Sequence, residues 1–155
     1  MQNDDFEIML DKHLSLVKKQ LLLCSKEMQK RALEHDQDKL NDININQTYK
    51  KYFPELKKIP FGTEEYFEFE KIHFLEAHKK HAQNRHHYYS SKSKVKDVNL
   101  FDILEAIIDI SQSSKQYNNS CSVEESLRKK NIFDYELEEI ICNTINYLEE
   151  KTEKS

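Results

Sequence analysis

The sequence predicts an all-α protein, and three observations support this prediction. Only one glycine and two prolines occur among 155 residues, so the chain offers few positions for tight turns. Leucine, isoleucine, glutamate, lysine and glutamine, which favour helices, are abundant. Apolar side chains recur at steps of three and four residues, the spacing of an amphipathic helix. We therefore expect one domain over residues 1–155, with its core at about 5–150, built as a bundle of five to seven helices.

Composition and charge exclude several classes of protein. The chain has no GxGxxG and no GxxxxGKS/T motif, which argues against a nucleotide-binding sheet with glycine-rich loops. The net charge of −4 argues against a dedicated DNA-binding protein, because phosphate binding usually rests on a surplus of lysine and arginine. Cys24, Cys121 and Cys142 are widely spaced and odd in number, which predicts reduced thiols.

The sequence also predicts the cellular compartment. No apolar run is long enough to span a bilayer, so we expect no membrane association. The acidic N-terminus lacks the basic and apolar regions of a secretion signal. We therefore expect a cytoplasmic protein, in a bacterium or in the phage-infected host cell.

The first helix should span residues 5–25, and His13 lies on or beside its apolar stripe. A histidine there is either a hydrogen-bonded core residue or a ligand, and both interpretations stay open. A second helix at residues 26–34 should place His35 and Asp36 at or near its end.

The adjacent His35 and Asp36 can give an imidazole nitrogen and a carboxylate oxygen to one divalent cation. This mixed set suits Mn, Fe, Co, Ni, Zn or Mg rather than a purely structural thiolate site. A single His-Asp pair is a weak signal, but six further histidines and a later helix with carboxylates on one side strengthen it. We therefore predict a site for one or two metal ions within the helical bundle.

The middle of the chain contains the clearest breaks. Residues 41–47 are polar and predict a loop. A short helix at 47–53 should stop before Pro54, because proline disfavours helical geometry in the preceding residue. Thr63 is the expected N-cap of a long helix that should reach about residue 88.

Four histidines lie within ten residues near the end of this long helix. They form either a solvated polar helix end or part of a functional site. The members of this group, together with an asparagine that shares a helical face with one of them, are His78, His81, Asn84, His86 and His87.

After a connection at residues 90–97, the strongly apolar segment 98–117 predicts a central helix. Asp102, Glu105 and Asp109 lie on one side of it. These carboxylates form either a solvent-facing edge or a row of ligands. For Asp109, which has isoleucine on both sides, we favour the ligand interpretation.

The end of the chain predicts a loop and two helices but no catalytic or ligand residue. A polar loop at residues 117–122 should lead into a short helix that Ser122 caps. Asp134 should cap a last amphipathic helix at 135–150, and residues 149–155 should fray.

The order of the candidate residues resembles the HD-domain superfamily of helical metal-dependent phosphohydrolases. In that superfamily, a histidine from an early helix, an adjacent His-Asp pair and an aspartate from a late helix bind one metal. The resemblance implies the ligands His13, His35, Asp36 and Asp109. Lys39 is similar to the lysine of the HD-x-x-K form of the motif and would neutralise charge on a phosphate.

A finer pattern over roughly residues 10–115 resembles a small, poorly characterised family of phage and bacterial proteins with a domain of unknown function. Two positions depart from this pattern, Asp38 and Ile110, where we expect a small hydroxyl residue and an aromatic one. We expect neither to be a ligand. The matching residues are His35, Asp36 and Lys39, then Ala77, His81, Asn84, His86 and His87, then Glu105 and Asp109.

The resemblance implies metal-dependent hydrolysis of a phosphomonoester, phosphodiester or nucleotide, with a metal-activated water attacking phosphorus. The basic residues Lys79, Lys80 and Arg85 are placed to attract such an anionic substrate. The expected catalytic residues are Asp36, Lys39, His81, His86 and His87. The residues expected to bind substrate or a second metal are His78, His81, Asn84, His86, His87 and Glu105.

Two other functions stay open. One is a di-iron, oxygenase-like HD protein, which requires six or more histidine and aspartate ligands, and this chain has enough. The other is a non-catalytic phage or bacterial interaction protein that keeps the fold and acts through its surface. The sequence specifies no oligomeric state.

Overall fold

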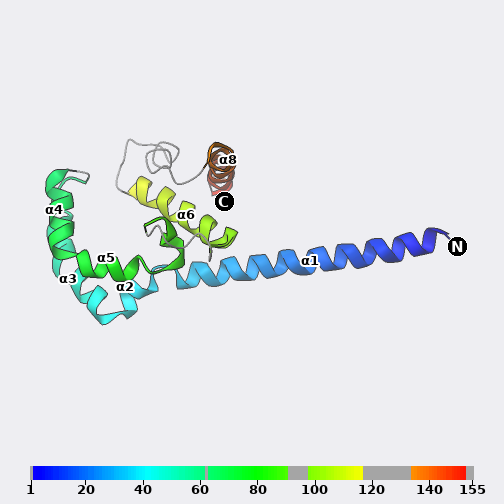
Figure 1. Ribbon diagram of the computed structural model, residues 1–155, viewed down its shortest axis with the longest axis horizontal. Coiled ribbons are helices and arrows are strands. Elements are labelled where there is room, and N and C mark those ends of the chain that lie inside the picture. The colour runs from blue at the N-terminus through cyan, green and yellow to red at the C-terminus, as the bar shows by residue number, and fades with distance from the viewer. Residues whose placement is uncertain (1, 62, 91–97, 117–133, 153–155) are drawn as a thin grey trace. The chain divides into compact units, whose positions relative to one another are not determined.

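A computed structural model describes residues 2–61, 63–90, 98–116 and 134–152. This part of the chain is mainly helical, and it contains no strand (Figure 1). The all-α prediction is therefore confirmed. The chain divides into two compact units, residues 1–37 and residues 38–155, which are described in turn. The expected single domain stays a prediction. Among the described helices, none combines the length and the apolar character that crossing a bilayer requires.

The first unit is formed by α1 (Gln2–Glu34), the long blue helix of Figure 1. The predicted division into two helices near residue 25 is wrong. No glycine or proline interrupts this stretch, and Arg31 Nε donates to Glu27 Oε1 at 2.7 Å across one helical turn. The helix ends where Asp36 adopts a φ of 57°, a left-handed conformation that aspartate tolerates better than most residues.

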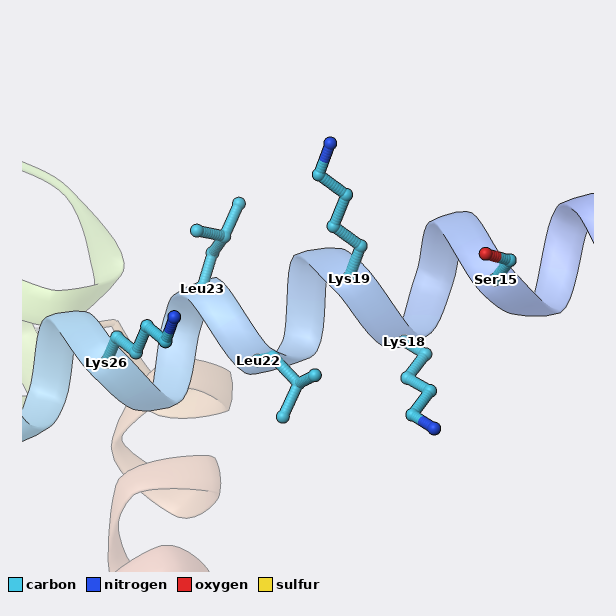
Figure 2. A pocket seen from close by; sticks show the side chains of 6 residues that line it. All are labelled: Ser15, Lys18, Lys19, Leu22, Leu23 and Lys26. Atoms are coloured by element: carbon cyan, nitrogen blue, oxygen red, sulfur yellow. The ribbon is translucent and has the colours of Figure 1, made fainter.

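The surface of α1 carries exposed apolar side chains among charged ones. Many of its large apolar side chains are exposed, among them Phe6, Leu14 and Leu21, and His13 is exposed too. Figure 2 shows a shallow depression on this surface, and its lining side chains point in several directions from a single helix. This depression is part of the open helix surface and not an enclosed binding site. Its lining residues are Ser15, Lys18, Lys19, Leu22, Leu23 and Lys26.

The second unit begins with α2 (Gln37–Asn41) and α3 (Ile43–Leu56), which replace the loop predicted at residues 41–47. That prediction is wrong because Asp42 caps α3: its Oδ1 accepts from the backbone nitrogens of Asn44 and Ile45 at 3.0 and 3.1 Å. The side chain of Lys80 hydrogen-bonds to Asp42 and lowers the pKa of its carboxyl group, as do the two backbone bonds. This contact joins the start of α3 to a helix almost 40 residues later.

The predicted stop before Pro54 is also wrong, because α3 continues through the proline to Leu56. The last turn is held by tertiary packing. Leu56 is buried in a cluster with Tyr66 and Phe74, so the burial of this turn outweighs the local preference against helix before proline.

The prediction of a single long helix at residues 64–88 is wrong. The structure has α4 (Glu64–His73), α5 (Leu75–His81) and the 3₁₀ helix η1 (Arg85–Ser90). The break between α4 and α5 falls at Phe74, whose side chain is 0% exposed. The break lets this ring enter the aromatic cluster, where its centroid lies 5.1 Å from that of Tyr49.

The caps predicted at Thr63 and Asp134 are confirmed. Thr63 Oγ1 accepts from the backbone nitrogen of Tyr66 at 3.2 Å at the start of α4. Asp134 Oδ1 accepts from the backbone nitrogen of Leu137 at 3.0 Å at the start of the last helix. Both bonds satisfy backbone donors that the first helical turn leaves without an intrahelical partner.

A second core forms between α6 (Leu100–Gln116) and α8 (Tyr135–Thr152), as predicted for segments 98–117 and 135–150. The fraying predicted for residues 149–152 is wrong, because α8 continues to Thr152. Its buried residues are Ile107, Ile110, Ile141 and Ile145. The predictions for residues 91–97, for the loop at 117–122, for the helix after Ser122, for Cys121 and for the last three residues lie outside the described part of the chain.

A half-buried carboxylate on α4 should make stability depend on pH. Burial raises the pKa of Glu70 above its usual value of 4.5, and a hydrogen bond from Tyr66 partly opposes this effect. Because the pKa of Glu70 is higher in the folded than in the unfolded protein, the folded state loses stability as the pH rises and the carboxyl group ionises. Ionised Glu70 therefore opposes folding at neutral pH. We expect Glu70→Gln to raise the urea midpoint at pH 7, by less than about 1 kcal/mol because the half-exposed group is screened. The gain should shrink at pH 4, and equal midpoints at pH 7 would contradict the argument.

Candidate metal centre

Three histidines of the second unit converge around the end of α5. His81 is the last residue of α5, while His86 and His87 belong to η1. Successive i,i+3 backbone bonds reverse the chain between them: Asn84 donates to His81 and His87 donates to Asn84, both at 3.0 Å. One ligand nitrogen of each histidine lies within 4.8 Å of those of the other two. His81 and His86 are buried, so this group is not a solvated helix end.

Both nitrogens of the His81 ring have a defined partner. Nδ1 lies 2.8 Å from Asp38 Oδ2, which also accepts from Asn84 Nδ2 at 3.0 Å. A carboxylate at Nδ1 holds the proton there and leaves the lone pair on Nε2. This Nε2 lies 2.8 Å from the Nε2 of His87.

The facing Nε2 atoms of His81 and His87 suit a shared cation. Two imidazoles bound to one ion at about 2.0–2.1 Å place their nitrogens roughly 3 Å apart, close to the observed 2.8 Å. Without an ion, the same spacing is a hydrogen bond in which His87 donates to His81. The geometry therefore fits a transition metal with little rearrangement of the two rings.

A second carboxylate–histidine pair involves α6. His86 Nδ1 lies 3.2 Å from Glu105 Oε1, and the Nε2 atom of His86 is buried. Asp109, one turn after Glu105, places a carboxylate oxygen within 4.8 Å of a ring nitrogen of His86. Ser113 Oγ donates to Asp109 at 3.4 Å. The structure thus brings together His81, His86, His87, Glu105 and Asp109.

His78 has a different environment. Its ring stacks on Phe74 with centroids 5.5 Å apart, and it lies 6.4 Å from the ring of Tyr49. Burial lowers the pKa of His78, and the nearby charges of His81 and Lys39 lower it further. The neutral imidazole is therefore favoured, in a largely aromatic setting.

The other predicted ligands belong to the first unit. His35 and Asp36 follow the end of α1, with 3.7 Å between His35 Nε2 and Asp36 Oδ1, and both are half-buried. His13 is exposed on α1. The metal-binding role of His35 and Asp36 stays a prediction. The continuous helix α1 places His13 roughly 30 Å from His35, so these two residues of one chain cannot hold the same ion.

The basic residues near the cluster are engaged with carboxylates. Lys79 Nζ lies 2.8 Å from Glu76, Lys80 pairs with Asp42, and Arg85 donates to Asp102. An anionic substrate would have to compete with these carboxylates.

Sequence reasoning missed two carboxylates of this region. Asp38 was assigned no role, yet it contacts His81 from 43 residues away, and no local pattern reveals that pairing. Asp102 was considered an edge or ligand residue, but it is fully buried and bonded to Arg85 and Asn99. The spacing Asn99-x-x-Asp102 is that of a capping box, so this second signal was present in the sequence.

The fold and the cluster define an all-α protein with a histidine- and carboxylate-rich centre. The chain belongs to the Family of unknown function (DUF5662), whose model matches residues 2–150. No curated protein and no solved structure shows a significant match. The family match covers every candidate residue and agrees with the resemblance to an uncharacterised domain.

Proposed function

We propose that the protein is a metal-dependent phosphohydrolase of the HD type. The observation that supports this most is the convergence of His81, His86 and His87, two of which have a carboxylate at Nδ1. Imidazole and carboxylate ligands suit transition metals, and outer carboxylates orient ligand histidines in many metal sites. Asp38 and Glu105 would take this outer role.

Chain connectivity supports a contribution from the His-Asp pair. Asp36 precedes Asp38 by two residues, so their Cα atoms are at most about 7.6 Å apart. The Asp38 carboxylate contacts the His81 ring, and the covalent chain alone keeps Asp36 close to Asp38. We propose that His35, Asp36 and Asp109 hold one ion of Mn, Fe, Co, Ni, Zn or Mg. His13 is not part of this set, because it lies roughly 30 Å from His35 along the continuous helix α1. A second ion would then use the histidine cluster.

The chemistry follows from these assignments. A bound divalent cation makes a coordinated water more acidic and polarises a phosphoryl oxygen. Asp36 would orient the attacking water through a carboxylate oxygen. Lys39 would neutralise charge on the phosphate. When the site holds only one ion, His87 would act as the general acid. It would carry a proton on Nε2 and give it to the leaving oxygen. The substrate would be an anionic small molecule or a nucleotide.

The experiment that tests this function measures metal content by elemental mass spectrometry, with the wild type beside Asp36→Asn and Asp11→Asn. Asparagine keeps the shape and the backbone preference of aspartate but removes the charge, and Asp11 is an exposed residue of α1. We expect one or two equivalents in the wild type and in Asp11→Asn, and a clear loss in Asp36→Asn. Phosphoester and nucleotide hydrolysis with the metal found should follow the same order. A wild type that binds no metal after incubation with Mn, Fe, Ni and Zn would contradict the proposal.

The imidazole-rich cluster also supports a second candidate, an oxygen-activating di-iron protein, because imidazole suits iron. Visible absorbance that depends on iron, without phosphoester hydrolysis, would favour this candidate. Stable binding of another protein without turnover would favour a non-catalytic interaction protein instead.

A further inference from the structure

We infer that Arg85 and Asp102 form a positioning pair that holds η1, and with it His86 and His87, against the first turn of α6. This inference rests on the proposed function insofar as it assigns the pair a role in metal binding. Neither residue touches the proposed ion. The pair would act through the two histidines that follow Arg85 directly in the chain.

Asp102 is a buried carboxylate that accepts hydrogen bonds from Arg85 and Asn99. Its side chain is 0% exposed, and its Oδ2 accepts from Arg85 Nη2 at 2.7 Å and from Arg85 Nε at 3.2 Å. The same oxygen accepts from the backbone nitrogen of Asn99 at 2.9 Å. A buried carboxylate needs such donors, because burial without them costs several kcal/mol.

The capping box at the start of α6 fixes the position of this carboxylate. Asn99 Oδ1 accepts from the backbone nitrogens of Phe101 and Asp102 at 2.9 and 3.1 Å, while Asp102 accepts from Asn99 in return. The positive end of the helix dipole also favours the negative charge of Asp102. Arg85 therefore binds to an acceptor whose place the helix itself determines.

The segment that carries the histidines depends on such an anchor. η1 is a short 3₁₀ helix with a non-helical residue, His87, at φ −95° and ψ 22°. Short 3₁₀ segments have weaker backbone hydrogen bonding than α-helices, so side-chain contacts set their placement. Two such contacts reach α6, from Arg85 to Asp102 and from His86 to Glu105, and the two acceptors are three residues apart on one helical face.

A purely structural role of Asp102 makes a different prediction. If Asp102 only capped α6, removal of the Arg85 side chain would leave the histidine rings unchanged, since the reciprocal bonds of the capping box run between Asp102 and Asn99. The positioning role instead requires that variants of either partner disturb the rings and that the two effects are not additive.

The test compares Arg85→Ala, Asp102→Asn and the double variant with the wild type. Each protein is titrated with Co²⁺ against a competing chelator, and the visible bands of bound Co²⁺ are recorded. We expect each single variant to bind Co²⁺ about 10–100-fold more weakly, as for other residues that orient ligands, and the double variant to be no weaker than the worse single variant. Arg85→Lys should recover part of the affinity. Lys71→Ala, which breaks an exposed ion pair with Glu68 on α4, is the matched control and should bind like the wild type.

A second measurement, on the metal-free proteins, separates this inference from the proposed function. Histidine side-chain ¹H–¹⁵N spectra should show the His81–His87 contact in the wild type and its loss in Arg85→Ala. Unchanged spectra in Arg85→Ala would overturn the inference. If the wild type binds Co²⁺, an unchanged affinity in Arg85→Ala would overturn it as well. A wild type that binds no Co²⁺ would overturn the proposed function, and the spectra would still decide the role of the pair. If Asp102→Asn fails to fold, the Arg85→Ala variant, which changes a largely exposed side chain, still decides the test.

Discussion

Replacement of His81 by alanine is expected to abolish most of the affinity of the protein for divalent transition metals. His81 occupies the middle of the cluster, since Asp38 contacts one of its nitrogens and His87 the other. Its loss removes a ligand and also the partner that aligns His87. We expect the affinity for Zn²⁺ or Co²⁺ to fall by more than the roughly 10–100-fold that loss of an outer carboxylate costs. Isothermal titration of the metal-free protein would measure this change.

Two further variants make this experiment specific. Asp38→Asn keeps the ligands but weakens the hold on the Nδ1 proton of His81, so its affinity should fall by about 10–100-fold, between the wild type and His81→Ala. His73→Ala removes a histidine whose ring stacks on Tyr52 at 4.4 Å, away from the cluster, and should bind metal normally. Equal affinities for the wild type and His81→Ala would refute the metal centre in the second unit.

Phe74→Ala is expected to give the largest loss of stability of any single substitution considered for this chain. Phe74 is fully buried between α4 and α5 and contacts the rings of Tyr49, Tyr52 and Phe69. Deletion of such a ring removes apolar burial and leaves a cavity, which together cost about 3–5 kcal/mol. The free energy of unfolding from urea denaturation, monitored by circular dichroism, would measure the loss.

The matched control is Phe67→Ala on the same stretch of chain. Phe67 is 54% exposed, so its replacement should cost well under half of the Phe74 effect. Similar losses for the two variants would show that the aromatic cluster around Phe74 is not the core of this part of the second unit.

Local signals in the sequence predicted local structure well. The helices α6 and α8 and the caps Thr63 and Asp134 were predictable because periodicity and side-chain capping act within a few residues. The predictions failed where distant contacts decide. The extension of α3 past Pro54 and the break at Phe74 both depend on burial against residues elsewhere in the chain, which outweighs local preference.

The candidate site shows the same division. The histidine cluster and Asp109 were predictable from residue type and spacing, because few other roles demand such a density of imidazoles. The partners that orient the histidines were not. Asp38 meets His81 across 43 residues and Arg85 meets Asp102 across 17, and such pairings follow from the tertiary fold rather than from any short motif.

The left-handed backbone of Asp36 restricts what can replace it. The residue that turns the chain out of α1 is also the one proposed to hold the ion. Glycine would satisfy the backbone but would bring no oxygen, whereas glutamate would bring an oxygen on a side chain poorly suited to φ 57°. If Asp36 holds the ion as proposed, this one residue sets both the chain direction and the metal affinity. Of the two acidic residues, aspartate serves both, and an attempt to adjust one property by substitution would change the other.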